Sequence, residues 1–202
     1  MRWWHAAAAG MGYRHMRKRT GELRIIGGTW RSRRIRFPGG PELRPTPDRV
    51  RETLFNWLGS WVEGRRVLDL FAGSGALGLE ALSRGAAEAV FVERSRVAAD
   101  ALRANAAALG ASGVTVVCNE ALNFLRREKG GFDLVFIDPP YASDLARPVL
   151  KRLLSGHILC EGGYVYLEEG GNAGAASISE ICPGLRVYRE VHAGTVYGRL
   201  LH

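Results

Sequence analysis

From residue 66 onward, short apolar segments alternate with helical stretches along most of the chain. The apolar segments lack strict alternation of apolar and polar residues, and each is followed by a stretch with helical spacing. This order is typical of parallel βαβ units in which helices cover both faces of the sheet. The expected strands are 67–71, 89–92, 114–118, 132–137 and 163–168, and the expected helices are 77–84, 96–109, 121–128 and 144–154.

The two ends of the chain carry different patterns. Two β-prone runs at 185–191 and 195–201, separated by His192-Ala193-Gly194, predict an antiparallel hairpin that completes the sheet. Near the N-terminus, 23–27 and 34–37 predict a small basic hairpin. Thr46 as N-cap and Pro47 at the first helical position then predict an amphipathic helix over 46–62.

Positive charge is concentrated in one part of the chain. The net charge is +8, whereas the segment 14–51 alone holds 12 basic residues against three acidic ones. The remainder is therefore close to neutral, which indicates a basic arm joined to an ordinary body; a merely solvated arm is the alternative. We expect a disordered extension over 1–21, a basic hairpin arm over 22–45 and a catalytic or binding domain over 46–202.

The chain has three cysteines, Cys118, Cys160 and Cys182, without CxxC spacing, and no apolar run of about 18 residues. These features favour a reducing cytoplasm, no structural metal and no membrane anchor. Because Met11 and Met16 are alternative starts, the extension is either native or the product of an upstream start codon.

A glycine-rich turn follows the first strand of the alternating region. Asp69 precedes Gly73-Ser-Gly75-Ala-Leu-Gly78, which opens a helix, so the backbone can approach a ligand closely. The string also satisfies the dinucleotide fingerprint, and Glu93 ends the next strand, where a ribose-binding acid is expected. This pattern predicts a cofactor that contains adenosine.

Three features favour S-adenosylmethionine over NAD. Asp69 would repel a pyrophosphate but suits the ammonium group of a methionine moiety. Glu120 and Ala121 follow the third strand, where an acid commonly receives the adenine in methyltransferases. Asp138-Pro139-Pro140-Tyr141 follows the fourth strand, and no nicotinamide enzyme requires it.

This tetrapeptide is similar to the (Asp/Asn)-Pro-Pro-(Tyr/Phe) signature of methyltransferases that act on planar amino nitrogens. Together with the glycine-rich turn it resembles a class I, Rossmann-like methyltransferase, which implies a mostly parallel seven-stranded sheet with an antiparallel C-terminal hairpin. Arg24-Ile-Ile-Gly-Gly28 and the string from Arg44 to Leu58 (RPTPDRVRETLFNWL) resemble the bacterial 16S ribosomal RNA guanine-N2 methyltransferases of the RsmD type. The resemblance runs from about Arg24 to the end.

The chemistry expected of the motif follows from the poor nucleophilicity of an exocyclic guanine amine, whose lone pair is delocalised into the ring. The Asp138 carboxylate and the Pro139 carbonyl can accept the two amine hydrogens, and Tyr141 can stack on an extruded base. Most of the rate would come from alignment of nitrogen, methyl carbon and sulfur, about 7 to 11 kcal/mol at best.

The resemblance implies a 16S ribosomal RNA substrate, within an assembled or assembling 30S subunit, for a monomeric enzyme that needs no metal. Phosphate contacts are expected from seven arginines: Arg31, Arg33, Arg34, Arg36, Arg44, Arg49 and Arg51.

Two departures from the family pattern are Glu120, where Asp is commoner, and Tyr141, where this subfamily often shows Phe. Three alternatives stay open: a DNA adenine-N6 or cytosine-N4 (or another RNA amino) methyltransferase, a nicotinamide-dependent oxidoreductase, and a non-catalytic RNA-binding protein. Asn105 is expected to serve local structure, and Trp57 and Trp61 to belong to the core.

Overall fold

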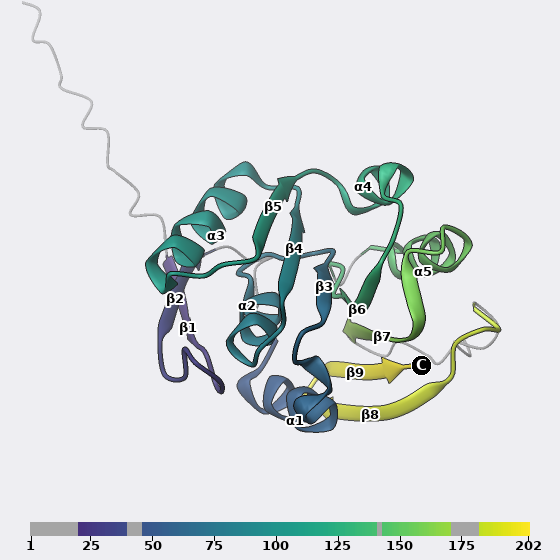
Figure 1. Ribbon diagram of the computed structural model, residues 1–202, viewed down its shortest axis with the longest axis horizontal. Coiled ribbons are helices and arrows are strands. Elements are labelled where there is room, and N and C mark those ends of the chain that lie inside the picture. The colour runs from purple at the N-terminus through teal and green to yellow at the C-terminus, as the bar shows by residue number, and fades with distance from the viewer. Residues whose placement is uncertain (1–19, 40–45, 141–142, 171–181) are drawn as a thin grey trace, which may run out of the picture.

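The computed structural model describes residues 20–39, 46–140, 143–170 and 182–202, and a seven-stranded mixed sheet forms its centre (Figure 1). The strand order is β5-β4-β3-β6-β7-β9-β8. The five strands from β5 to β7 are parallel, which confirms the predicted α/β fold. Their bounds are β3 Arg66–Asp69, β4 Glu88–Glu93, β5 Val114–Cys118, β6 Phe132–Ile137 and β7 Leu159–Gly170.

Helices cover both faces of this sheet, as the unalternating strands require. Three helices, α1 (Asp48–Leu58), α2 (Ala76–Ser83) and α3 (Arg96–Leu109), contribute to the apolar cluster on one face. Two others, α4 (Ala121–Arg127) and α5 (Ala146–Ser155), contribute to the cluster on the opposite face (Figure 1). None of the described helices is long and apolar enough to cross a membrane.

The predicted basic hairpin is present and is fastened to the body. Strands β1 (Thr20–Arg24) and β2 (Arg34–Pro38) pair antiparallel. Asn105 on α3 accepts from the Arg36 amide (3.1 Å) and donates to the Arg36 carbonyl (2.7 Å), which confirms its structural role. The inward side chains of the hairpin join the same core cluster as α1 and α2. The expected boundary at residue 21 was wrong, since Thr20 and Gly21 already belong to β1; residues 1–19 lie outside the described residues.

The first helix begins later than its sequence predicts. Pro47 occupies the N-cap position, no side chain caps the helix, and Asp48 is its first residue. Thr46 is buried, and its side chain interacts with Glu168 on β7 instead. The helix ends at Leu58, where Gly59 (φ 53°) starts the 3₁₀ helix η1 (Gly59–Val62). Trp57 and Trp61 pack against the core as expected.

The C-terminal hairpin completes the sheet in antiparallel sense. Strand β9 (Val196–Leu201) lies between β7 and β8 (Val187–Ala193). Strand β7 is longer than predicted because a register irregularity between Phe132 and Leu134 allows Leu159 to pair with the start of β6.

Candidate active site

The predicted site residues gather at the carboxyl edge of the parallel strands, where ligands of open α/β sheets bind. Asp69 is the last residue of β3, Glu93 the last of β4, and Asp138 follows β6 directly. These three strands are neighbours in the sheet. Segments up to 69 residues apart in the sequence thus meet at one edge.

The glycine-rich turn between β3 and α2 has the backbone conformation that glycine permits. Gly73 and Gly75 have φ angles of 50° and 80°, in the left-handed region. A Cβ on Gly75 would overlap a methyl group of Leu102 on α3. The turn is held by the Gly75 amide, which donates to the Ala72 carbonyl (2.6 Å). Glycine at this position therefore serves both the turn and its packing against α3.

Glu93 braces the turn from the neighbouring strand. Its Oε2 accepts from the Gly73 amide (2.8 Å) and its Oε1 from the Ser95 amide (2.7 Å). The side chain is only partly buried, so it borders the space in front of the turn. Its predicted ribose contact stays a prediction.

Asp69 is buried, with 2% of its surface exposed. Its Oδ2 accepts from the Gly78 amide at the start of α2 (3.2 Å). Burial raises the pKa of Asp69 to about 7, and the charge of Glu93 adds to the rise. A cation at this edge would restore the ionised form, which fits the predicted ammonium contact.

Asp138 and Pro139 occupy the turn directly after β6. Pro139 is buried and Asp138 is partly exposed at the sheet edge. Burial of its carboxyl group raises the pKa of Asp138 well above its ordinary value, and the charges of Glu168 and Asp69 raise it further. Tyr141 lies outside the described residues, so its predicted stacking role stays a prediction.

Glu168 was missed by the sequence analysis. This residue is 1% exposed on β7, and its Oε2 accepts from the Tyr166 hydroxyl (2.9 Å). Its Oε1 has no hydrogen-bond partner among the described residues. An acid at the end of an apolar strand was the signal that identified Asp69, and Tyr164-Val-Tyr-Leu-Glu168 carries the same signal.

Glu120 and Ala121 lie between β5 and α4, as predicted. Glu120 is exposed, and its Oε2 accepts from the Asn123 side chain (3.0 Å). Ala121 is buried at the first position of α4. Their position beside the edge is suitable for an adenine contact, which stays a prediction.

The predicted RNA-contacting arginines divide into two groups. Arg31, Arg33, Arg34, Arg36 and Arg49 are exposed. Arg34 and Arg36 pair with Glu22 at 2.8 and 3.4 Å, but both guanidinium groups remain largely exposed. Such surface pairs contribute little, so they compete weakly with a phosphate. Arg44 lies outside the described residues.

The expectation for Arg51 was wrong, because its side chain is completely buried and cannot reach a phosphate. Its Nη2 donates to Asp48 (2.6 Å) and to the Arg24 carbonyl (3.0 Å), and its Nη1 lies 3.5 Å from Glu80. An arginine on the apolar face of an amphipathic helix, three residues after an acid, is the sequence pattern that should have indicated burial.

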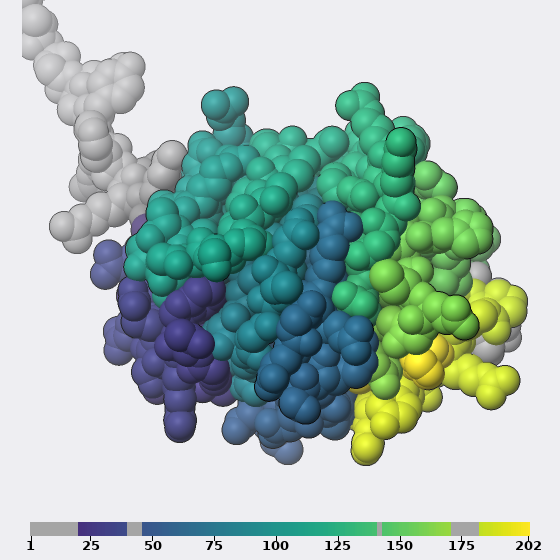
Figure 2. Space-filling view, viewed as in Figure 1, coloured from purple at the N-terminus to yellow at the C-terminus, as the bar shows by residue number. Residues whose placement is uncertain are grey.

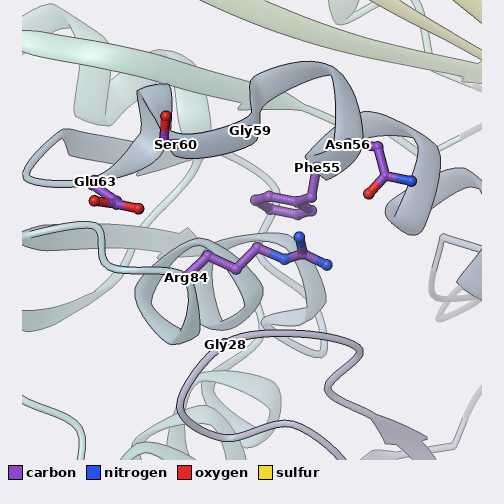
Figure 3. Close-up of a pocket in the computed structure, with 7 residues that line it drawn as sticks. All are labelled: Gly28, Phe55, Asn56, Gly59, Ser60, Glu63 and Arg84. Carbon is purple, nitrogen blue, oxygen red and sulfur yellow. The ribbon is translucent and has the colours of Figure 1, made fainter.

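Glu80 is the centre of this buried cluster. Its carboxylate also accepts from the amides of Ile26 and Gly27, both at 2.8 Å, and from Arg84 Nε at 2.7 Å. The Arg84 guanidinium carbon lies 5.1 Å from the ring centre of Phe55, beside a hollow between the arm and α1 (Figure 3). The cluster fastens the arm to the body.

Fold and site together define a class I, Rossmann-like methyltransferase. A glycine-rich turn, a strand-end acid and an Asp-Pro-Pro turn meet at the carboxyl edge of a sheet that ends in an antiparallel hairpin. In the described residues, no group of three or more His, Cys, Asp or Glu side chains could hold a metal ion.

Comparison with known proteins agrees with this class. The family model described as "Conserved hypothetical protein 95" matches residues 23–201, and the chain belongs to this family. "Ribosomal RNA small subunit methyltransferase D" of Escherichia coli (strain K12) is 41% identical over 181 residues, 90% of either chain. The Haemophilus influenzae protein of that name is 41% identical over 152 residues, 73% of this chain and 79% of that one.

Solved structures show the same fold. The "Putative methyltransferase yhhF from Escherichia coli" has a TM-score of 0.81 at 40% identity and covers 90% of this chain and 97% of that one. A putative methyltransferase complexed with SAH has a TM-score of 0.67 at 17% identity, over 83% of this chain and 53% of that one, and shows the fold alone.

Proposed function

We propose that the protein transfers a methyl group from S-adenosylmethionine to the exocyclic N2 amine of a guanine in 16S ribosomal RNA. The observation that carries the proposal is the position of Asp138 and Pro139 beside the Asp69 turn, in a chain closely similar to small subunit ribosomal RNA methyltransferases.

The electrostatics of the edge fit this cofactor. Three carboxyl groups, those of Asp69, Asp138 and Glu168, interact there, and each has a raised pKa. Such a cluster favours a ligand with positive charges and disfavours a pyrophosphate. S-adenosylmethionine, which supplies an activated methyl group on a sulfonium sulfur, carries two cationic centres. Asp69, Gly73, Gly75, Glu93, Glu120 and Ala121 would hold it.

Asp138 and Pro139 would hold and activate the amine. The Asp138 carboxylate and the Pro139 carbonyl accept its two hydrogens, which frees the nitrogen lone pair from the ring and directs it outward. The rigid Pro139-Pro140 pair fixes the direction of the carbonyl. Tyr141 would stack on the base.

The basic arm would supply the RNA-binding surface. Its exposed arginines lie on the hairpin that forms one end of the molecule (Figure 2). A hollow lined in part by Arg24, Arg34 and Thr46 lies between the hairpin and the start of α1. Thr46, which lines this hollow, also interacts with Glu168 at the end of β7.

The RNA substrate would be presented within an assembled or assembling 30S subunit in the cytoplasm, to a monomeric enzyme. A folded particle suits an arm whose arginines contact phosphates and whose site receives a single extruded base.

The test compares wild type, Asp138→Asn and the matched control Asp144→Asn, an exposed acid shortly after the motif. Each is incubated with labelled methyl donor and either naked 16S RNA or 30S subunits, and the modified base is mapped. We expect the Asp138 variant to bind S-adenosylmethionine normally by calorimetry but to lose at least about 100-fold in methyl transfer, the order of a lost acceptor. Full activity of Asp138→Asn, or binding of NADH in place of S-adenosylmethionine, would refute the proposal.

A further inference from the structure

Glu168 and Asp138 come from neighbouring parallel strands at the same level. Ile137 on β6 is in register with Leu167 on β7, so the next residues, Asp138 and Glu168, stand side by side. Two positions earlier, Phe136 and Tyr166 are also in register and their rings contact edge to face at 6.3 Å. Since side chains alternate along a strand, Asp138 and Glu168 point to this same face.

The surroundings of Glu168 hold its carboxyl group in place without neutralising it. The Tyr166 hydroxyl donates to it (2.9 Å), and the Thr46 side chain interacts with it. Opposite on β9 stands Gly198, which has no side chain. The neighbouring cation on β9, Arg199, binds Glu169 (2.5 Å) and Glu190 (2.7 Å) instead. Of the titratable groups that interact with Glu168, Asp138 is an acid and Tyr166 is its hydrogen-bond donor.

A carboxyl group that is 1% exposed, with one oxygen lacking a hydrogen-bond partner in the described part of the chain, is costly to maintain. Burial raises the pKa of Glu168, whereas the two hydroxyl groups lower it. These hydroxyl groups favour the ionised form of Glu168, and its charge then raises the pKa of Asp138. The two carboxyl groups are coupled, so they lose their protons in two steps that belong to the pair.

We propose that Glu168 is a positioning residue of the methyl-transfer site, which acts through Asp138 and makes its carboxylate a stronger base for the amine of the substrate. This inference rests on the proposed function and deepens it. The nitrogen lone pair forms the bond to the methyl carbon, and the carbon–sulfur bond breaks with its electron pair on sulfur. The amine then loses a proton to the Asp138 carboxylate, which later releases it to water.

The first experiment needs neither cofactor nor RNA. Titration of ¹³C-labelled carboxyl groups by NMR, with the Asp138 signal assigned from Asp138→Asn, gives the midpoint of Asp138 in the free protein. We expect Glu168→Gln to lower this midpoint by about one pH unit or more, because a like charge is removed. Tyr166→Phe destabilises ionised Glu168, so it should lower the Asp138 midpoint by a smaller amount. An unmoved midpoint in both variants would overturn the inference; Tyr166→Phe keeps the ring and serves if the Gln variant does not fold.

The second experiment follows methyl transfer to 30S subunits against pH. In Glu168→Gln, the fall of the methyl-transfer rate on the acid side of the pH profile should move to lower pH together with the Asp138 midpoint. The rate at high pH should fall several-fold, because the Asp138 carboxylate is then a weaker base. The control is Glu169→Gln, next in sequence but paired with Arg199, and its acid limb should stay in place. An unmoved limb in Glu168→Gln despite a moved NMR midpoint would overturn the positioning role. Absence of RNA methylation by wild type would overturn the proposed function instead.

Discussion

Glu80→Gln should be among the most damaging isosteric substitutions in this chain. The Glu80 carboxylate is fully buried and accepts from two arm amides and from Arg84, with Arg51 3.5 Å away. Glutamine replaces one acceptor oxygen by a donor amide, which must face at least one of these N–H groups. Arg51, also fully buried, keeps the largely exposed Asp48 but loses its buried anionic partner. Breaking a buried pair costs about 3–5 kcal/mol, a large part of the about 5–15 kcal/mol by which a domain is stable.

Urea denaturation, followed by tryptophan fluorescence and circular dichroism, measures this loss. The control is Glu88→Gln, which removes a half-exposed pair with Arg66 (3.0 Å) and should cost at most about 1 kcal/mol. Arg51→Met combined with Glu80→Gln should cost less than the sum of the two single variants. A loss below about 1 kcal/mol for Glu80→Gln, or strict additivity in the double variant, would refute the reasoning.

Three further predictions concern the turn, the arm and the arginine surface. The pKa of Asp69 is raised from 3.8 to about 7, so its contribution to stability is present below about pH 4 and is lost, by up to about 4 kcal/mol, as the pH rises to about 7. Urea titrations at several pH values should show this loss in wild type relative to Asp69→Asn. If the unfolding free energies of the two proteins change in parallel with pH, the prediction is contradicted. Gly28→Ala should cost at least about 2 kcal/mol more than Gly64→Ala, since both have φ near 70° but only a Cβ on Gly28 overlaps the Ser83 carbonyl; equal unfolding free energies would show that the overlap is relieved. Replacing Arg31, Arg34 and Arg36 by Gln should reduce the slope of log affinity for RNA against log salt concentration by about 2. The Arg51→Met variant, provided that it folds, should leave this slope unchanged. The reverse result would show that the RNA phosphates do not contact the exposed arginines of the arm.

The strand and helix order was predictable because each element carries its own signal. Segments 96–109, 114–118 and 132–137 were predicted with the bounds that the structure has. The parallel arrangement followed from strands without alternation, and the position of Asp69 and Asp138 at one edge followed from that arrangement.

What the sequence did not reveal depends on contacts between distant segments. The local sequence predicts Thr46 as an N-cap, but in the fold its side chain interacts with Glu168 on β7. Arg51 belongs to a segment rich in arginine, yet its side chain is buried beside the carboxylate of Glu80, which lies 29 positions further on in the sequence. Glu168 needed the register of β6 with β7 to be placed beside Asp138.

The attachment of the arm has a consequence for substrate choice. Its inward side chains share one core with α1 and α2, and Glu80 and Asn105 fix its backbone at two places. The exposed arginines of the arm and the catalytic edge of the sheet are thus held at a fixed distance from each other. Under the proposed function, an RNA would have to bring its target base and its phosphates to that spacing by its own folding. The enzyme would then select a three-dimensional shape and reject a flexible strand of identical sequence.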